Sequence, residues 1–456
     1  MTILNRPPSS LSPSASFFRL SRVLQLILAC CAAAFPAFGE TYFVAPPPLG
    51  SDANAGTDLA PWATLQHAAD SVSAGDTVIV SGGDYVGMYL DTSGTAQAPI
   101  VFTVADGETA NVIADNATTP DGINIEGADH VVIEGFQVDG RSRAGIRAVL
   151  CSHVTIRGNS LDANERWGIL TGFCDDLLIE NNVASNSVIE HGIYVSNSGD
   201  RPTVRGNVLF GNAANGLHMN GDRFAGGDGV IDDALVENNI IYDNGTAGGS
   251  GINCDGVTNS LIRNNLVYNT HASGLSLYQI DGGAPSTGNQ VLNNTIVVAP
   301  DGRWGINIQN GSSGNTVKNN IIYSRHGFRG AMSICSSCTT GLVSDHNVME
   351  DRLTLDDGGS VLTLDEWRTA TGQDSNSVIV ADVDSLFVDS ASSDFHLAPG
   401  VAVDAGEALA SVPTDLEGTP RPIGTGWDVG SFEGVGTIFT DGFETSDTSL
   451  WGATIP

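Results

Sequence analysis

One strand pattern recurs through the middle of this sequence at a nearly constant interval, and it constrains the fold more than any other feature. Each copy starts with glycine and alternates apolar residues with others, as in GINIE, GIYVS and GLHMN. The glycines that start the copies are Gly122, Gly145, Gly168, Gly192, Gly216, Gly251, Gly274 and Gly305. Their spacing is 23 or 24 residues, except for two longer steps of 35 and 31 residues. A unit this short cannot bury its own apolar side chains, so neighbouring units must stack and share one core.

A second element follows half a unit later and carries an asparagine at the same position each time. These asparagines are Asn159, Asn182, Asn207, Asn239, Asn265, Asn294 and Asn320. Identical asparagines stacked one above the other can exchange side-chain amide hydrogen bonds and satisfy the buried backbone of a turn. A β-sandwich has short alternating strands as well, but neither a fixed step nor such a column. The pattern predicts an all-β chain, a right-handed parallel β-helix with its coils over about residues 110–350 and the asparagines facing inward.

The ends of the repeat array determine the predicted domain organisation. Residues 40–113 should form an N-terminal cap and the first coils, with an amphipathic helix opening at Pro61 over the first coil. Residues 114–349 should form the regular β-helix. Residues 350–433 should form the last coils and a C-terminal cap, with residues 387–397 as the final rung. An acidic tail should occupy residues 434–456.

Residues 1–39 are typical of a secretory signal peptide. A region with three arginines precedes an apolar stretch over residues 23–38, and Ala37-Phe38-Gly39 resembles a cleavage site. We therefore expect cleavage near Gly39 and a secreted protein, extracellular or periplasmic. Cys30 leaves a lipoprotein signal open as the alternative. We expect no membrane-spanning segment, because the apolar stretch is short and no later segment is long enough.

The charge balance restricts the partners. The chain has 52 acidic and 19 basic residues and a net charge of −33, so we expect neither nucleic acid nor an anionic membrane as a partner. Five cysteines remain after the predicted signal peptide. Cys335 and Cys338 should form a disulfide, and Cys151 and Cys174 occupy equivalent places in successive coils, where a bond stays open. Cys254 should lie in the core.

The outward positions of the glycine-led strands define a candidate site. Stacking the repeats brings together a polar patch of Tyr194, His218, Asn220, Asn253 and Asp255, with His191, Asp222 and Tyr278 at its edge. The two long steps place insertions at residues 221–233 and 279–288, on one side of the solenoid, where they should wall a groove. Such a patch on a rigid sheet suits a sugar-polymer site, although ordinary outward residues would look similar.

The candidate residues divide into three roles. The predicted catalytic residues are His218, Tyr194, His191 and Tyr278, with His218 foremost because an unperturbed imidazole titrates near neutral pH. The predicted substrate-binding residues are Asn220, Asn253, Gln309 and Trp304, the last as a sugar-stacking face. The predicted ligands of a Ca²⁺ ion are Asp222, Asp228 and Asp255.

Three segments resemble a known family. The N-terminal segment reads TYFVAPPPLGSDANAGTDLAPWATLQHAADSVSAGDTVIVSGGDY, and the C-terminal segments read DFHLAPGVAVDAG and RPIGTGWDVGSFE. They resemble secreted bacterial β-helix proteins of the pectate lyase superfamily, nearest to family-nine polysaccharide lyases. The resemblance implies a lyase that cleaves a uronate-containing polysaccharide by β-elimination, with calcium assistance.

One departure from the family bears on the reaction. Calcium-dependent members resemble one another in a lysine beside an aspartate cluster, whereas the only lysine here, Lys318, falls in a column of mixed charge beside the asparagines. That column is typical of a solvated face. Two alternatives therefore stay open: a non-catalytic glycan-binding or adhesion module, and either a hydrolase with Asp222 and Asp255 as its two carboxylates or an epimerase. In each case we expect a monomer whose partner is a polysaccharide or a glycan ligand.

Overall fold

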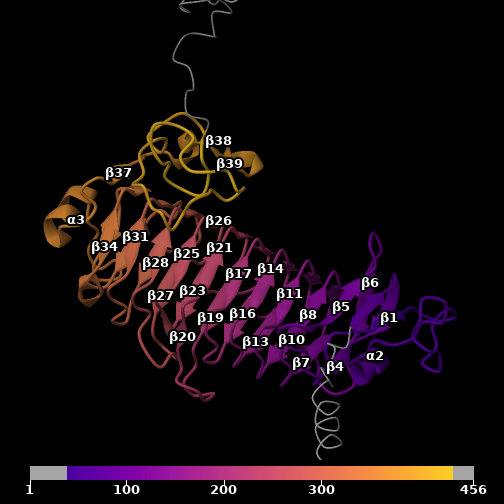
Figure 1. Ribbon diagram of the computed structural model, residues 1–456. Helices are drawn as coiled ribbons and strands as arrows, with labels where there is room; N and C mark the ends of the chain where they lie inside the picture. The colour runs from indigo at the N-terminus through magenta and orange to yellow at the C-terminus, as the bar shows by residue number, and fades with distance from the viewer. Residues whose placement is uncertain (1–38, 435–456) are drawn as a thin grey trace, which may run out of the picture. The chain divides into compact units, whose positions relative to one another are not determined.

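The computed structural model describes residues 39–434. Apart from Gly39 and Gly434, the predicted signal peptide and acidic tail lie outside the described residues. Within the described part, the chain winds through three parallel sheets in a right-handed β-helix (Figure 1), which confirms the predicted fold class. No helix in residues 39–434 is long and apolar enough to cross a membrane.

Sheet 1 contains the glycine-led strands and is the sheet on which the candidate site was predicted. In spatial order its strands are β4 (Met88–Leu90), β7 (Ile123–Glu126), β10 (Ala144–Val149), β13 (Trp167–Gly172), β16 (Ile193–Ser196), β19 (Leu217–Asn220), β23 (Ser250–Asp255), β27 (Ser273–Tyr278), β30 (Ile306–Ile308), β33 (Met332–Ile334) and β36 (Leu353–Thr354). A short parallel pair, β20 (Ile231–Asp232) and β24 (Val257–Thr258), lies just after this sheet.

Sheets 2 and 3 follow sheet 1 in each coil. Sheet 2 consists of β1 (Thr41–Val44), β2 (Thr77–Val80), β5 (Ile100–Val104), β8 (Val131–Glu134), β11 (Thr155–Arg157), β14 (Leu178–Glu180), β17 (Thr203–Arg205), β21 (Leu235–Glu237), β25 (Leu261–Arg263), β28 (Gln290–Leu292), β31 (Thr316–Lys318) and β34 (Val343–Asp345). Sheet 3 consists of β3 (Gly83–Val86), β6 (Ala110–Ala114), β9 (Gln137–Asp139), β12 (Ser160–Asp162), β15 (Val183–Ser185), β18 (Val208–Phe210), β22 (Ile240–Tyr242), β26 (Leu266–Tyr268), β29 (Thr295–Val298), β32 (Ile321–Ser324), β35 (Val348–Met349) and β37 (Val378–Ile379).

The core consists of apolar side chains that repeat at one inward position of every rung. In sheet 1 the fully buried members of this column are Ile123, Ile146, Ile169, Ile193, Leu217, Ile252, Leu275 and Ile306. Each is the Cα partner of the next across a parallel strand pair, as Ile193 is of Leu217. Because the side-chain period of a strand is two, the residues between these positions point outward and form the face of the sheet.

The asparagine column lies at the corner between sheets 2 and 3, as predicted. The side-chain amide of Asn207 donates to Oδ1 of Asn239 (3.0 Å), and Asn239 donates likewise to Asn265 (2.9 Å). The same exchange joins each neighbouring pair from Asn159 to Asn347, and every member is at most 1% exposed. The predicted inward asparagine ladder is confirmed.

The residue before each ladder asparagine has a left-handed backbone. These residues are Gly158, Asn181, Gly206, Asn238, Asn264, Asn293 and Asn319, with φ between 51° and 63°. Glycine and asparagine adopt this region at the lowest cost, which explains the Gly-Asn and Asn-Asn pairs of the repeat.

The first coil contacts a short helix. Helix α2 (Leu65–Ser71) buries Leu65, Ala68 and Ala69, and Gln66 exchanges two hydrogen bonds with the backbone of Tyr89 on β4, the edge strand of sheet 1. That this helix caps the solenoid stays a prediction.

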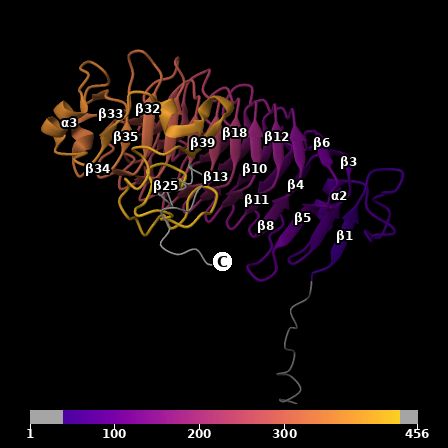
Figure 2. The same cartoon turned by 90° about the horizontal axis from the view of Figure 1, so that it is seen from above.

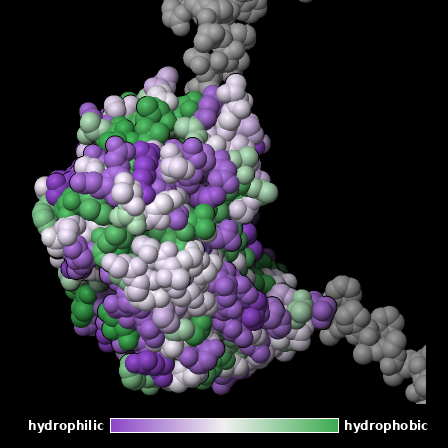
Figure 3. Space-filling view, turned by 90° about the vertical axis from the view of Figure 1, so that its left-hand side faces the viewer, coloured by the Kyte–Doolittle hydropathy of each residue, from purple (hydrophilic) through white to green (hydrophobic). Residues whose placement is uncertain are grey.

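The C-terminal residues depart from the predicted last rung. Strands β38 (Phe387–Asp389) and β39 (Asp394–Leu397) pair antiparallel with each other instead of joining a parallel sheet. This segment follows helix α3 (Leu364–Thr371) in the chain. The side of the molecule on which α3 lies carries both hydrophilic and hydrophobic residues (Figure 3). Three short 3₁₀ turns complete the secondary structure: η1 (Ser336–Thr339), η2 (Val383–Leu386) and η3 (Ser390–Ser392).

The C-terminal segment, drawn in yellow in Figures 1 and 2, packs on sheet 3, where Phe395 contacts Tyr268, and also reaches side chains of sheet 2. Lys318 pairs with Glu407 at 2.7 Å, and Arg263 donates to the carbonyl of Ser411 and pairs with Glu237. The prediction that this column is a solvated face is therefore wrong at Lys318 and Arg263, whose side chains are only 17% and 19% exposed. The residues that cover these two side chains, Glu407 and Ser411, follow the antiparallel pair in the chain.

The cysteines occupy the predicted kinds of position. Cys335 and Cys338 form a disulfide, which confirms the predicted pair, and Cys151 and Cys174 are bonded as well. Cys254 is free and fully buried in the core, as expected.

Candidate functional site

The outward columns of sheet 1 have the predicted register. Tyr194 is the Cα partner of His218, and His218 is the partner of Asn253. In the second column, Asn220 is the partner of Asp255, which is the partner of Tyr278. The repeat therefore placed these residues on neighbouring rungs correctly.

A groove of about 600 Å³ lies on this face, but one to three rungs closer to the C-terminus than the predicted patch. Four predicted site residues line it: Asn253, Tyr278, Gln309 and Trp304. The other predicted site residues do not line it; they are Tyr194, His191, His218, Asn220, Asp222, Asp228 and Asp255.

The floor of the groove consists of uncharged polar side chains from sheet 1. Ser250, Asn253, Ser273, Ser276 and Asn307 all line it. Oγ of Ser250 lies 2.8 Å from Oγ of Ser276 and donates to Oδ1 of Asn253 at 3.3 Å. Hydroxyl and amide groups both donate and accept hydrogen bonds, so this floor can satisfy the hydroxyl groups of sugars.

Tyr278 lines the groove with its phenol held in place. Nδ2 of Asn253 donates to the phenol oxygen at 2.6 Å, so the phenol acts as acceptor and its own O–H remains available to a ligand. Burial, and secondarily the charge of Asp255, raises the pKa of Tyr278 well above its usual value. The phenol is therefore protonated at neutral pH and can serve as a proton donor.

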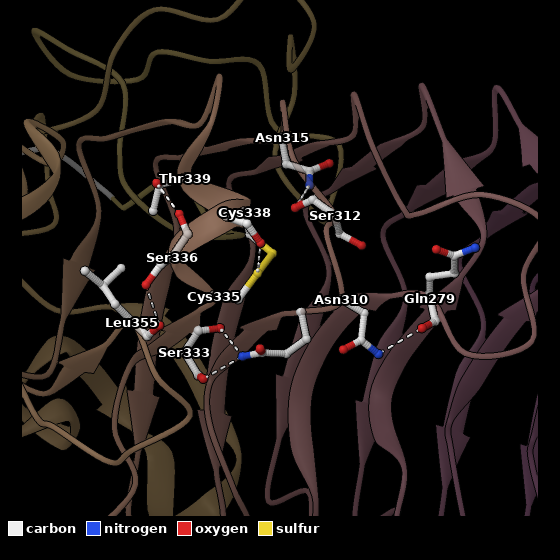
Figure 4. The surroundings of a disulfide bond; sticks show 12 residues. Gln279, Asn310, Ser312, Asn315, Ser333, Cys335, Ser336, Cys338, Thr339 and Leu355 are labelled. Atoms are coloured by element: carbon white, nitrogen blue, oxygen red, sulfur yellow. Dashed lines mark hydrogen bonds between the residues drawn. A yellow bond between two sulfur atoms is a disulfide. The ribbon is translucent and has the colours of Figure 1, made fainter.

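Residues that follow the sheet 1 strands form one wall of the groove, next to Tyr278. Gln309 donates to the hydroxyl of Ser333 at 2.9 Å and thus bridges two rungs. Asn310 donates to the carbonyl of Gln279 at 2.8 Å, a contact visible beside the Cys335–Cys338 disulfide in Figure 4. The insertion over residues 279–288 is thereby tied to the following rung.

Two arginines that the sequence reading missed form the opposite wall. Arg303 lies three residues before Ile306, and Arg329 lies three residues before Met332. Ile306 and Met332 belong to the inward column and are Cα partners. The two arginines therefore occupy the same position in consecutive rungs. An arginine recurring at one position of adjacent repeats was the signal that could have revealed them.

The two arginines differ in their charge partners. Arg329 lies 3.7 Å from the carboxylate of Asp357, which also lines the groove. No carboxylate of the described residues lies within ion-pair distance of Arg303, which is exposed. Arg303 thus presents an unpaired positive charge to the groove.

Trp304 does not offer a stacking face. Its side chain is 2% exposed, and the guanidinium of Arg329 lies 5.8 Å from the ring centroid. The expected sugar-stacking role is therefore wrong, because neighbouring rungs cover the ring.

His191 and His218 form a hydrogen-bonded pair beside the groove. The backbone N–H of Asn215 donates to Nδ1 of His191 (3.2 Å), so the proton of His191 lies on Nε2. That nitrogen lies 3.1 Å from Nδ1 of His218 and donates to it. His218 stacks on Tyr194 with ring centroids 4.9 Å apart, and Nδ2 of Asn220 donates to the Tyr194 phenol.

Both histidines are neutral at physiological pH. Burial lowers the pKa of His218 to about 3, and burial together with the neighbouring charges of His218 and Arg166 lowers the pKa of His191 well below its usual value. The expectation that His218 titrates near neutral pH is therefore wrong. Burial also raises the pKa of Tyr194 to about 12.

The histidine pair should make the fold sensitive to acid. The folded-state pKa of His218 lies below the unfolded value of about 6.5, so the unfolded chain binds more protons and stability is lost as the pH falls below that value. Between pH 7.5 and pH 5 we expect His218 to contribute a loss of about 2 kcal/mol in unfolding free energy. In His218→Gln, denaturant unfolding should show that the unfolding free energy falls by about 2 kcal/mol less between pH 7.5 and pH 5 than in the unsubstituted protein. His153→Gln, at a 52% exposed side chain, controls for the loss of an imidazole, and equal acid losses in the two variants would contradict the prediction.

The predicted calcium ligands do not converge. Asp255 accepts three backbone N–H groups, from Ile280 (2.9 Å), Asp281 (2.8 Å) and Gly282 (3.0 Å), and is 2% exposed. Its carboxylate therefore holds the 279–288 insertion in place and is not free to act on a substrate.

Asp222 and Asp228 each accept a backbone N–H within their own loop. Across residues 39–434, no three His, Cys, Asp or Glu side chains are grouped so that they could hold a metal ion. The three aspartates do not fit a shared Ca²⁺ site.

The chain matches two family models. A Pel9A-like right-handed beta helix region matches residues 42–188, and a right-handed beta helix region matches residues 210–347. The curated protein pectate lyase PEL9 of Emericella nidulans is 40% identical over 93 residues, which are 20% of this chain and 22% of that protein. The chain thus spans about a fifth of the length of this relative.

Solved structures share the fold at low identity. The crystal structure of pectate lyase Pel9A superposes with a TM-score of 0.58 at 17% identity, covering 87% of this chain and 97% of that one. A rhamnogalacturonan lyase superposes with a TM-score of 0.52 at 16% identity, covering 84% and 95%. At these identities the likeness establishes the β-helix and not the reaction.

Proposed function

We propose that this chain, a right-handed parallel β-helix with a Pel9A-like region over residues 42–188, is a polysaccharide lyase that cleaves a uronate-containing chain by β-elimination. The observation that carries the proposal is the unpaired charge of Arg303 over a floor of uncharged polar side chains. In a chain of net charge −33, a free cation in a groove favours an acidic ligand at that point. The likeness to pectate lyase PEL9 supports the same class of substrate.

The groove residues have distinct roles in such an elimination. Arg303 binds the uronate carboxylate and stabilises the negative charge that develops when solvent water takes up the proton of the neighbouring C–H group. Tyr278 donates its phenol proton to the glycosidic oxygen as the C–O bond breaks and the C=C bond forms. Asn253 holds the phenol oxygen in position.

Elimination fits the groove better than hydrolysis. A glycoside hydrolase of the usual kind needs two carboxylates that flank the scissile bond. Asp357 is the single carboxylate among the groove-lining residues, and it pairs with Arg329.

Glycan binding without cleavage is the second candidate. No histidine or lysine lines the groove, so none of its side chains has an ordinary pKa near neutrality to act as the base. A polar groove of this kind can hold a sugar chain without breaking it.

We also propose that the protein is secreted. The disulfides Cys151–Cys174 and Cys335–Cys338 favour an oxidising compartment and agree with the predicted signal peptide.

The proposal predicts ultraviolet-absorbing products. Incubated with a panel of uronate and neutral polysaccharides, with calcium or with chelator, the protein should release unsaturated ends from a uronate polymer. Arg303→Gln should lower kcat/KM by about 10- to 100-fold, because a charged hydrogen bond to the substrate is lost. Arg157→Gln, on sheet 2 and 43% exposed, is the matched control.

Other products would contradict the lyase. Reducing ends without ultraviolet absorbance would indicate a hydrolase. Binding of a polymer without any cleavage would favour the second candidate.

A further inference from the structure

The groove contains few charges for a site that takes an acidic polymer. Its charged lining residues are Arg303, Arg329 and Asp357. Because Asp357 lies 3.7 Å from Arg329, these two largely cancel, and Arg303 remains as one free positive charge. The groove thus has a place for one carboxylate.

On the rungs at the groove, the column of the two arginines supplies no third cation. In these neighbouring rungs, the position that lies three residues upstream of the inward residue is occupied, in order, by Gly249, Ala272, Arg303, Arg329 and Glu350. Rungs are about 4.8 Å apart, so a sugar chain lying along the solenoid passes these positions in turn. An unbroken polyuronate would meet uncharged residues on one side of Arg303 and, on the other, the Arg329–Asp357 pair, which carries little net charge.

We infer that the groove takes a polysaccharide in which uronate residues alternate with neutral sugars. Asp357 determines this selectivity because its carboxylate pairs with Arg329, which therefore does not bind a second uronate. The inference rests on the proposed function and specifies its substrate. The uronate binds at Arg303, and neutral sugars bind next to it over Ser250 and Ser276 of the two preceding rungs and over Asn307 of the same rung. A second adjacent uronate would meet the Asp357 carboxylate, and like charges held close together disfavour binding.

Asp357 is held in place by its turn. Oδ1 of the preceding Asp356 accepts the N–H of Ser360 (2.8 Å) and the hydroxyl of Thr354 (2.8 Å), which orders the turn. Asp357 itself has a left-handed backbone with φ of 57° and a side chain that is 71% exposed. Asparagine tolerates the same backbone, so Asp357→Asn removes the charge without straining the turn.

The test compares the binding of two sugar hexamers. Calorimetry measures the binding affinity for a hexamer of galacturonate and for a hexamer of alternating galacturonate and rhamnose. The protein carries Tyr278→Phe so that turnover is suppressed. We expect the alternating hexamer to bind about 5-fold more tightly or better. Asp357→Asn should strengthen binding of the galacturonate hexamer by about 5-fold and of the alternating hexamer by less than about 2-fold.

The control is Asp365→Asn, a 90% exposed carboxylate on α3 that pairs with Arg368. It should change neither affinity. Tighter or equal binding of the galacturonate hexamer by the unsubstituted groove would overturn the inference alone, as would equal effects of Asp357→Asn and Asp365→Asn. Binding of neither hexamer would overturn the proposed function and the inference with it.

Discussion

Replacing Tyr278 by phenylalanine should lower kcat on the cleaved polysaccharide by about 10²-fold or more. The change removes only the phenol O–H, which is the proton donor available in the groove. The ring remains, so KM should change little, while the Asn253 amide loses its acceptor at a cost of about 1–3 kcal/mol of unfolding free energy. Initial rates of ultraviolet-absorbing product over a range of polymer concentrations separate kcat from KM.

The pH profile gives a second check on Tyr278. The proton donor must be protonated, and the raised pKa of the phenol means that it stays so well beyond neutral pH. Activity should therefore show no alkaline loss from this group below about pH 10, the usual value for tyrosine. A loss of activity near pH 8 that disappears in Tyr278→Phe would contradict the role.

Tyr242→Phe is the matched control for the loss of a phenol. Tyr242 lies on sheet 3, stacked between Phe210 and Tyr268, and the same outward column already contains a phenylalanine. If Tyr278→Phe retains as much activity as Tyr242→Phe, Tyr278 is not the proton donor.

The register of the solenoid could be predicted because it depends on which type of residue recurs at a given position of each repeat. Gly192 and Gly216 are 24 residues apart, and the rungs that follow them pair residue for residue, as Tyr194 does with His218. An error of one residue would turn the inward column outward, so burial of the apolar column determines the register strongly.

The groove was misplaced because its walls come from segments outside the glycine-led strand pattern. Asp357 lies in a turn after the last strand of sheet 1, and Arg303 precedes a strand by three residues, where the preceding rungs have alanine or glycine. Sequence periodicity identifies the floor of a solenoid groove. It does not identify which irregular segments rise beside that floor.

Burial explains the other errors. Asp255 faces outward by register, yet the 280–282 backbone folds over it and donates three N–H groups to its carboxylate. His218 also faces outward, yet His191 and Tyr194 cover its ring and lower its pKa. Outward position was predictable, but exposure was not, because it depends on loop conformation and on the size of neighbouring side chains.

The asparagine ladder should be the most sensitive feature of the fold. Asn239 is fully buried; its side-chain amide donates to the carbonyl of Val204 and to Oδ1 of Asn265, and its Oδ1 accepts two N–H groups from Asn207. Asn239→Ala leaves these buried partners without hydrogen bonds, each at a cost of about 1–3 kcal/mol. The expected loss of unfolding free energy is about 3–5 kcal/mol, because part of the ladder can relax.

The measurement must separate this loss from the general effect of truncation. Gln290→Ala removes an exposed side chain on β28 of sheet 2 and should change stability by less than about 0.5 kcal/mol. Hydrogen exchange should then show the damage in Asn239→Ala concentrated in the rungs that contain Asn207 and Asn265, since each rung of a solenoid contacts only its neighbours. If Asn239→Ala is no less stable than Gln290→Ala, the ladder fills space without contributing its hydrogen bonds. In that case the apolar column alone would hold the coils in register.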